Sequence, residues 1–523
     1  MILGAIVVLI CICSNRLSDK IGVPALVIFI AVGMLFGTDG IVHIDFNNYQ
    51  LAEYICTAAL ISIMFYGGFS TKWSAAKPVA GKAIVLSSAG TVLTAALTCL
   101  CCYFFLRIDI LESFLIGAVV SSTDAASVFS ILRSKNLNLK GGLASLLEVE
   151  SGSNDPFSYM LTVVALALMD GKGVGFVGPM ILLQILLGLI SGAVIGLGTV
   201  RILKRFDFIS NGLDSIFVVA VAVMSYAVPS ILGGNGFLSV YIAGIIMGNA
   251  KIRHKTSLVH FFDGITGLAQ IAVFFLLGLL AFPSQLPGIF LKAMAITLVL
   301  TFLVRPAVIF LLMGKSGIRE KLFVSWAGLR GASSIVFAIM ASVSGAYTKN
   351  DVYHIVFCVS LLSVSVQGTL LPAVARKLKL IDDNTDVLKT FNDYQDDSSM
   401  TLMCMKVPKG HGWEHKKLSD IQLPDDTLAL MVKRGTETLI PKGDTVILPG
   451  DKVILNVPSY STGPDVKLRE IIIDKEHPWK EKYIEELEMP QENLIVMIKR
   501  GDESIIPRGQ TRILEGDTVV VYD

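Results

Sequence analysis

The chain has 523 residues, of which 53% are hydrophobic and 17% are charged, and its formal net charge is +1. A soluble protein of this length carries a larger share of charged residues, so the composition predicts an integral membrane protein and argues against a soluble enzyme. A net charge so close to zero also speaks against a nucleic-acid partner.

Thirteen apolar segments are interpreted as membrane-spanning helices, which take about 17–25 residues each. They are residues 1–15, 23–37, 52–70, 80–106, 112–133, 142–169, 174–200, 214–232, 236–250, 257–282, 286–313, 320–342 and 351–375. Basic residues gather in alternate loops, such as the loop with Lys72, Lys77 and Lys82. Because basic loops stay in the cytoplasm, we expect the N-terminus outside and the C-terminus in the cytoplasm. The predicted fold class is therefore a mainly α-helical membrane bundle.

Three of these spans are interrupted by polar or glycine-rich residues. The fifth contains Ser121–Asp124, the twelfth contains Gly328–Gly331, and the ninth begins at Gly233–Gly236. Polar breaks at matching places in two halves of a chain indicate a transporter built from inverted repeats. Since unwound backbone at membrane depth must line a cavity or pack in protein, we expect the first two breaks to cross beside the sixth span.

The sixth span carries Glu150, Ser151, Asn154 and Asp155 in its middle. Carboxylates at this depth are costly, and those that are kept usually serve ions or protons. Ser151 and Asp155 are four residues apart, so their oxygens share one helix face, while Glu150 and Asn154 share the adjacent face. We therefore expect Asp155 to bind a proton or a monovalent cation, and Glu150 to be paired within the bundle.

The breaks supply further candidates. Thr123 is expected to contact the ion and Asp124 to compensate the broken helix, with simple capping of a helix end as the alternative. Arg330 is a buried cation that needs a partner, for which Glu150 is the first choice and a helix C-terminus is the competitor. Arg305 in the eleventh span is interpreted as a residue that staples helices or extends to the membrane surface, with lining of a transport path as the alternative.

After about residue 380 the composition becomes polar. We expect a transmembrane domain at residues 1–380, a linker at 381–399 and a soluble tail. The tail repeats itself without gaps at a spacing of 66 residues, with short β-rich runs between Gly and Pro turns. The sequence thus predicts two small α+β modules, at 400–458 and 466–523.

Each module carries a Lys-Arg-Gly turn, which begins at Lys433 in the first copy and at Lys499 in the second. These lysines are candidates for binding the phosphates of a nucleotide. The alternative is that they are ordinary solvated residues of a β-turn.

Several motifs together resemble the electroneutral branch of the monovalent cation/proton antiporters, the CPA1 type. They are Thr123-Asp124, Glu150-Ser151, Asn154-Asp155, and Arg330 within Ala327-Gly-Leu-Arg-Gly-Ala332. The resemblance covers about residues 1–380. The tail modules resemble the C-terminal domain of regulators of potassium conductance, the TrkA-C type, with Ile440–Asp444 and Leu448–Asp451 as signature turns. The combination is similar to bacterial potassium/proton antiporters.

The resemblance implies a role for individual residues. Asp155 binds the cation or the proton, helped by Ser151 and Thr123, and Glu150 forms a structural pair with Arg330.

In the family, the asparagine that matches Asn154 supports the pair of Glu150 and Arg330. The chain departs from the family pattern at Ala125, where many relatives carry proline after the Thr-Asp. The tail after residue 380 contains no Gly-x-Gly-x-x-Gly motif, so the dinucleotide-binding half of a full conductance regulator is not expected there.

The sequence thus predicts a secondary antiporter, not an enzyme, in the plasma membrane of a bacterium and without a cofactor. Because Asn154 is neutral, the site has one titrating carboxylate, and one-for-one exchange with a proton would be electroneutral. Potassium is the first expectation for the cation and sodium the second, since only the type of tail favours potassium.

The two tail modules are expected to pair with each other or across a homodimer, and to bind a regulatory ligand such as a cyclic dinucleotide between them. One alternative is a gated cation channel with the same tail, against which the missing Thr-Val-Gly-Tyr-Gly filter counts. Another is a membrane-anchored ligand sensor, which leaves Asp155 and Arg330 without a role.

Overall fold

A computed structural model describes residues 5–13, 24–135, 137–205, 213–252, 255–314 and 316–381. In the tail it describes residues 400–522 except 409, 422, 424–426, 435–436, 459–467, 475–476, 488–493, 501–502, 506 and 508. The chain divides into two compact units, Met1–Gln395 and Asp396–Asp523. The predicted linker at 381–399 lies outside the described residues, apart from Ile381.

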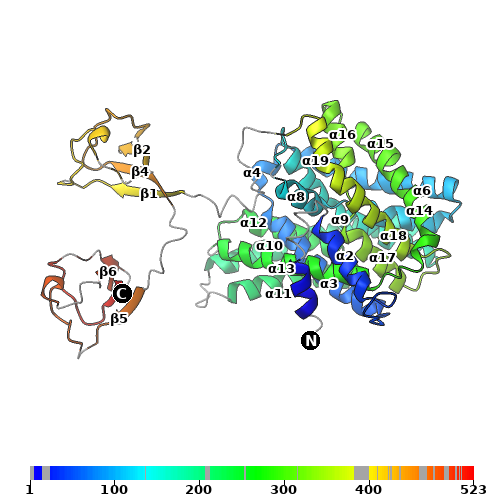
Figure 1. The fold of residues 1–523 in the computed structure, drawn as a ribbon, viewed down its shortest axis with the longest axis horizontal. Helices are drawn as coiled ribbons and strands as arrows, with labels where there is room; N and C mark the ends of the chain where they lie inside the picture. The colour runs from blue at the N-terminus through cyan, green and yellow to red at the C-terminus, as the bar shows by residue number, and fades with distance from the viewer. Residues whose placement is uncertain are drawn as a thin grey trace. The chain divides into compact units, whose positions relative to one another are not determined.

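The first unit is a bundle of helices (Figure 1). Residues 5–13 are helical, and the helices that follow are α2 (Ala25–Phe36), α3 (Tyr49–Ser70), α4 (Trp73–Ala76), α5 (Ala80–Val85), α6 (Thr91–Leu106), α7 (Ile110–Val119), α8 (Ala125–Ser134), α9 (Leu143–Met169), α10 (Val177–Arg205), α11 (Leu213–Ile231), α12 (Gly236–Asn249), α13 (Lys255–Leu279), α14 (Leu286–Val299), α15 (Arg305–Leu312), α16 (Ile318–Trp326), α17 (Ala332–Val343), α18 (Val352–Leu362) and α19 (Thr369–Lys377). Three π-helical segments, η1 (Leu86–Gly90), η3 (Leu300–Val304) and η4 (Ser363–Gly368), join α5 to α6, α14 to α15 and α18 to α19.

Among the described residues, seven continuous helical stretches are long and apolar enough to cross a bilayer. They are Tyr49–Ser70, Ala80–Leu106, Val174–Arg205, Leu213–Ile231, Ser257–Leu279, Leu286–Leu312 and Val352–Lys377. Of the remaining predicted spans, the first is described only at residues 5–13, and the others correspond to helices that are short, broken, or interrupted by charged residues as α9 is. The structure therefore confirms a mainly helical membrane bundle, while the count of thirteen spans stays a prediction.

The predicted breaks are present. The fifth span is divided into α7 and α8 by residues 120–124, and the twelfth is divided into α16 and α17 by residues 327–331. The break after α7 forms even though Ala125 stands where a proline was expected from the family pattern. Polar residues and an N-terminal cap on α8 are thus enough to end the helix at this depth.

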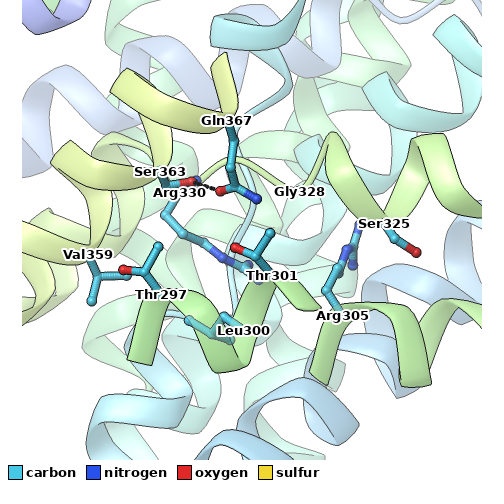
Figure 2. Close-up of a pocket in the computed structure, with 10 residues that line it drawn as sticks. All are labelled: Thr297, Leu300, Thr301, Arg305, Ser325, Gly328, Arg330, Val359, Ser363 and Gln367. Atoms are coloured by element: carbon cyan, nitrogen blue, oxygen red, sulfur yellow. Dashed lines mark hydrogen bonds between the residues drawn. The ribbon is translucent and has the colours of Figure 1, made fainter. Parts of the chain in front are cut away.

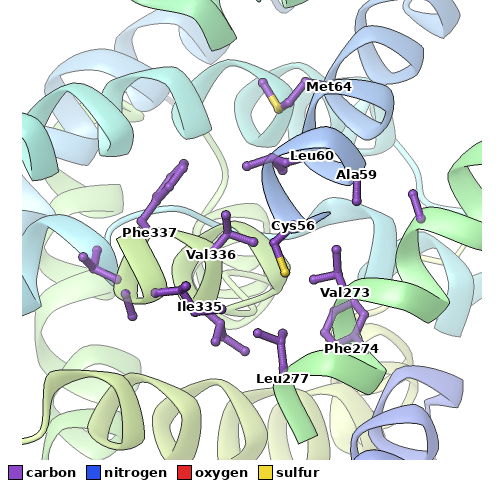
Figure 3. Close-up of a cluster of buried hydrophobic side chains, with 14 of the residues drawn as sticks. Cys56, Ala59, Leu60, Met64, Val273, Phe274, Leu277, Ile335, Val336 and Phe337 are labelled. Carbon is purple, nitrogen blue, oxygen red and sulfur yellow. The ribbon is translucent and has the colours of Figure 1, made fainter. Parts of the chain in front are cut away.

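Small residues and aromatic side chains share the packing of the bundle. Gly33 of α2 and Gly278 of α13 lie so close that a Cβ on Gly33 would be 2.9 Å from the Cα of Gly278. Membrane helices associate through such small residues, because lipid offers no hydrophobic driving force between them. Figure 3 shows the apolar core where α3, α13 and α17 meet, with Phe274 and Phe337 among its buried side chains.

The tail contains two four-stranded antiparallel sheets of the same topology. The first has the strand order β1 (Met400–Lys406), β4 (Lys452–Pro458), β2 (Leu428–Arg434), β3 (Glu437–Leu439). The second has the order β5 (Leu468–Ile472), β8 (Thr518–Tyr522), β6 (Leu494–Arg500), β7 (Glu503–Ile505). Even the register shift in β2, between Ala429 and Met431, recurs in β6 between Ile495 and Met497.

The predicted α+β character of the modules is wrong for the described residues. Apart from strands, each module has one short 3-10 turn, at Leu418–Asp420 in the first and at Ile484–Glu486 in the second.

Candidate functional site

The two breaks cross each other, as the sequence predicts. The amide of Asp124 donates to the carbonyl of Leu329 at 2.8 Å. From the second break, Arg330 Nη1 donates to the carbonyl oxygens of Ser121 at 3.0 Å and Ser122 at 2.7 Å. The guanidinium therefore satisfies backbone acceptors that unwinding leaves open at the end of α7.

Asp155 lies at the middle of α9, beside this crossing. Its side chain is only 7% exposed, and Ser122 Oγ donates a hydrogen bond to its Oδ1. A carboxylate held by a hydroxyl, with no cationic partner among the described residues, can bind either a proton or a cation.

Ser151 and Asn154 fasten α9 to the first break. Ser151 Oγ donates to the carbonyl of Thr123 at 2.7 Å and accepts from the amide of Ala125 at 2.8 Å. Asn154 Nδ2 donates to Thr123 Oγ1 at 2.6 Å. Three polar side chains thereby fix the unwound backbone against α9, and the amide of Ala125 takes part in a bond that a proline could not make.

Asp124 caps the helix that follows it. Its carboxylate accepts from the amide of Ser127 at 3.2 Å and from Ser127 Oγ at 2.5 Å. Gly331 lies directly against this side chain, because a Cβ on Gly331 would overlap with the Asp124 carboxylate. These contacts are the capping of a helix end that the sequence offered as the alternative role of Asp124.

The predicted pairing of Glu150 with Arg330 is not the one in the structure. Glu150 Oε1 accepts from Arg305 Nη2 at 2.5 Å, and both side chains are buried. Arg330 bonds instead to the carbonyls at the end of α7, which is the competing partner considered from the sequence. The reason is geometric: the crossing of the breaks brings Arg330 to backbone carbonyls, and α15 brings Arg305 to the face of α9 that carries Glu150.

Arg305 and Arg330 both line a small cavity of about 10 Å³ (Figure 2). Ser363 and Gln367 also line it and are joined by a hydrogen bond of 2.5 Å. Arg305 Nε is buried and has no hydrogen-bond partner among the described residues. The space is that of a single water molecule, so this cavity belongs to the packing around the ion pair.

A larger cavity of about 520 Å³ reaches Asp155. Its walls come from α2, α3, α8, α9, α12 and α13, together with the first break and the start of α17. Thr123, Ser151 and Asp155 line it, whereas Glu150 and Asn154 do not. The two helix faces distinguished in the sequence are thus also separate in space, one on the cavity and one in the protein.

Sequence reasoning missed Ser122 and Ser333. Ser122 bonds to Asp155, and Ser333, at the start of α17, lines the same cavity. Ser122 was visible as part of the polar break, but its rotation toward α9 depends on the backbone of residues 120–124. Arg305 was visible as a charged residue in an apolar span, yet nothing in the sequence paired it with Glu150.

In the Lys-Arg-Gly segments of the tail, the arginines and the lysines have different environments. Arg434 forms two bonds to Asp451, at 3.0 Å and 2.9 Å, and Arg500 repeats this with Asp517. The hydrogen bonds from Arg434 lower the pKa of Asp451 below its usual value. The arginines are therefore structural, while Lys433 in β2 is exposed.

The oxygen-rich site suits an alkali cation as cargo. In the described part of the chain no three His, Cys, Asp or Glu side chains are grouped as a metal centre would need. The ligands that Asp155, Ser151 and Thr123 offer are carboxylate and hydroxyl oxygens, which hard monovalent ions prefer.

Comparison with known proteins gives matches over both units. Residues 5–377 match the transmembrane sodium/hydrogen exchanger family, and residues 402–459 and 468–522 each match the TrkA-C domain. The chain is 32% identical to the K(+)/H(+) antiporter NhaP2 of Shewanella oneidensis over 86% of this chain and 79% of that protein. It is 33% identical to the K(+)/H(+) antiporter NhaP of Alkalimonas amylolytica over 87% of this chain and 81% of that protein.

Among solved structures, the sodium proton antiporter MjNhaP1 of Methanocaldococcus jannaschii matches with a TM-score of 0.63 and 22% identity, covering 70% of this chain and 97% of that one. This likeness shows a shared fold. The family match agrees with the crossed breaks and with the buried carboxylate that lines a cavity. The chain belongs to the sodium/hydrogen exchanger family of cation/proton antiporters, which are transporters and not enzymes.

Proposed function

We propose that the protein exchanges potassium for protons at Asp155. The observation that carries this proposal is the position of one carboxylate at the middle of α9, 7% exposed, hydrogen-bonded to Ser122 and lining a cavity of about 520 Å³. A carboxylate there holds a proton or a cation but not both, so binding of one expels the other. Thr123 and Ser151 line the same cavity and supply further oxygens.

The exchange is one cation for one proton. Glu150 is neutralised by Arg305, Asp124 is engaged in capping α8, and Asn154 carries no charge. Asp155 is then the one carboxylate of the crossing that changes its occupant, so each cycle moves no net charge.

Potassium is the cation that the relatives favour, since the proteins matched over most of their length are named K(+)/H(+) antiporters. Sodium is the second candidate, because a more distant relative, ApNhaP of Aphanothece halophytica, is named a Na(+)/H(+) antiporter at 27% identity. The donors at Asp155 alone do not separate the two ions.

The membrane arrangement that we propose has thirteen spans in two inverted repeats, with the N-terminus outside and the C-terminus in the cytoplasm of the inner membrane. Matching features support the repeats: π-helical segments η1 and η3 lie in the fourth and eleventh spans, and the breaks lie in the fifth and twelfth. We also propose that two copies form a homodimer. The domain division at 1–380, 381–399, 400–458 and 466–523 belongs to the same proposal.

The tail regulates exchange by binding a cytoplasmic ligand. A ligand shifts an equilibrium only through different affinities for two states, so the tail must contact the bundle or the partner subunit differently in each state. Because the two modules are equivalent, we place the ligand between them. A symmetric anion such as a cyclic dinucleotide suits the two equivalent sheets, and Lys433 and Lys499 are the proposed partners of its phosphates. The exposed side chain of Lys433 supports this, and a binding measurement with Lys433→Ala and Lys499→Ala variants tests it.

The central test is flux in vesicles driven by a pH gradient, with potassium and then sodium. Asp155→Asn should abolish exchange of either ion while the protein keeps its melting temperature. Asp170→Asn is a matched control, because Asp170 is exposed and follows α9 at its far end. Residual exchange in Asp155→Asn would remove Asp155 from the mechanism, and potassium current without proton movement would favour the channel.

A further inference from the structure

A polar stripe runs along α13 on the wall of the large cavity. Asp263, Thr266 and Gln270 line the cavity together with Gly267. These positions follow the i, i+3, i+4, i+7 pattern of one helix face. Asp263 and Gln270 are about 10 Å apart along the axis, given a rise of about 1.5 Å per residue. Phe274 also lines the cavity and is buried in the apolar core that α13 shares with α3 (Figure 3).

Asp263 is an unusual residue for such a helix. The stretch Ser257–Leu279 is apolar enough to cross a bilayer, and Asp263 is its sole Asp, Glu, Lys or Arg. The side chain is exposed, while Tyr66 of α3 is buried and donates from its hydroxyl to Asp263 Oδ1 at 3.2 Å. No cation pairs with Asp263 in the described part of the chain. A carboxylate kept in a membrane helix without a cationic partner is a functional candidate.

Thr266 gives an independent sign of a ligand on this wall. The residue is only 9% exposed and lines the cavity, yet its Oγ1 has no hydrogen-bond partner among the described residues. A hydroxyl in a membrane helix usually bonds to a carbonyl of its own helix, as Thr91, Thr94 and Thr98 do. A buried hydroxyl without a hydrogen-bond partner lowers the stability of the fold, unless a bound ion or molecule contacts it.

The cavity has room for an ion before Asp155. A volume of about 520 Å³ holds many water molecules, each taking about 30 Å³ in the liquid. The lining residues Ser70, Glu148 and Asp263 belong to the ends of α3, α9 and α13 that adjoin the basic loops. By the positive-inside rule that side is cytoplasmic.

We propose that Asp263 and Thr266 form a second cation site, in which a partly hydrated monovalent cation from the cytoplasm is held before it reaches Asp155. The inference rests on the proposed function, since it requires Asp155 to be the exchange site. Asp263 supplies the charge and Thr266 Oγ1 supplies a neutral oxygen one helical turn deeper. The site raises the local cation concentration and leaves the proton exchange itself to Asp155.

The test measures the apparent KM for potassium added to the cytoplasmic face of everted membrane vesicles. Asp263→Asn should raise this KM about four- to tenfold, as expected for removing one charge near the ion. Thr266→Val should raise it about two- to fivefold. Asp263→Glu should restore a KM near that of wild type, which separates loss of charge from misfolding. Asp170→Asn removes an equal charge outside the cavity and should leave the KM unchanged.

Two outcomes overturn the proposal. One is a KM for Asp263→Asn within twofold of wild type. The other is a double variant whose KM effect equals the product of the single effects, because two residues that hold one ion must be coupled. Failure of the proposed function looks different: Asp155→Asn would then retain exchange, whatever the KM of the Asp263 variants.

Discussion

Arg305 Nη2 lies 2.5 Å from Glu150 Oε1, and the two side chains are 4% and 1% exposed. The pair joins α15 to α9 at a position five residues before Asp155 along α9. Arg330 lies near it but bonds to the carbonyls of Ser121 and Ser122. The two buried arginines therefore have different duties: Arg305 neutralises a carboxylate, and Arg330 closes the end of a broken helix.

The first prediction concerns this pair. Glu150→Ala and Arg305→Ala should each cost about 3–5 kcal/mol of stability, because each leaves an uncompensated buried charge. The double variant should lose much less than the sum of the two. Melting temperatures in detergent measure this, and the cycle of Glu150 with Arg330 is the control, with a smaller coupling. Equal coupling in both cycles would contradict the assignment.

The second prediction concerns Ala125. Proline is well suited to the first position of a helix, so Ala125→Pro should keep α8 intact but remove the amide that bonds to Ser151 Oγ. We expect a loss of about 0.5–1.5 kcal/mol. The loss should disappear in a Ser151→Ala background, as melting temperatures of the four proteins can show. An equal loss in both backgrounds would mean that the bond contributes nothing.

The third prediction concerns the contact between Gly331 and Asp124. A Cβ at residue 331 would overlap with the Asp124 carboxylate that caps α8, so Gly331→Ala should lower both melting temperature and exchange rate. Gly198→Ala in α10 is the control, because no atom lies within 4 Å of the added Cβ. A Gly331→Ala protein that behaves like the control would show that Asp124 moves without loss.

The fourth prediction concerns the acid stability of the first tail module. Arg434 lowers the pKa of Asp451, so the stabilisation is complete above the unfolded-state pKa of about 3.9 and is lost as the pH falls through the lower folded-state pKa. Hydrogen exchange of β2 and β4 should therefore be faster in Asp451→Asn than in wild type at pH 7. The difference should shrink toward pH 3, and a constant difference over this range would refute the linkage.

The fifth prediction concerns the tail as a whole. Leu380 and Ile381 pair with Lys140 and Leu139, so a cut after Gln395 keeps those contacts while removing both sheets. The truncated protein should still exchange ions, with an altered pH profile or an altered response to cyclic dinucleotides. Superimposable curves for the truncated and complete proteins under every condition would show that the tail does not regulate transport.

Much of this protein is determined by its sequence alone. Apolar length and polar breaks are local properties, so the helices around Ser121–Asp124 and Gly328–Gly331 were predictable, as was the crossing beside α9. The gapless repeat of 66 residues likewise predicted two equivalent modules, which the structure shows as two sheets of the same topology. Helical spacing separated Ser151 and Asp155, on the cavity, from Glu150 and Asn154.

Only the tertiary structure decided which charges meet. Glu150 and Arg305 are 155 residues apart. No local pattern ranks Arg305 above Arg330 as the partner, because both are cations in the interior of apolar spans. The choice depends on how α15 is placed against α9 and on carbonyls that unwinding exposes to Arg330. The candidate site at Asp263 and Thr266 could not be predicted from the sequence for the same reason. Only the packing of the helices shows that this face of α13 lines a cavity.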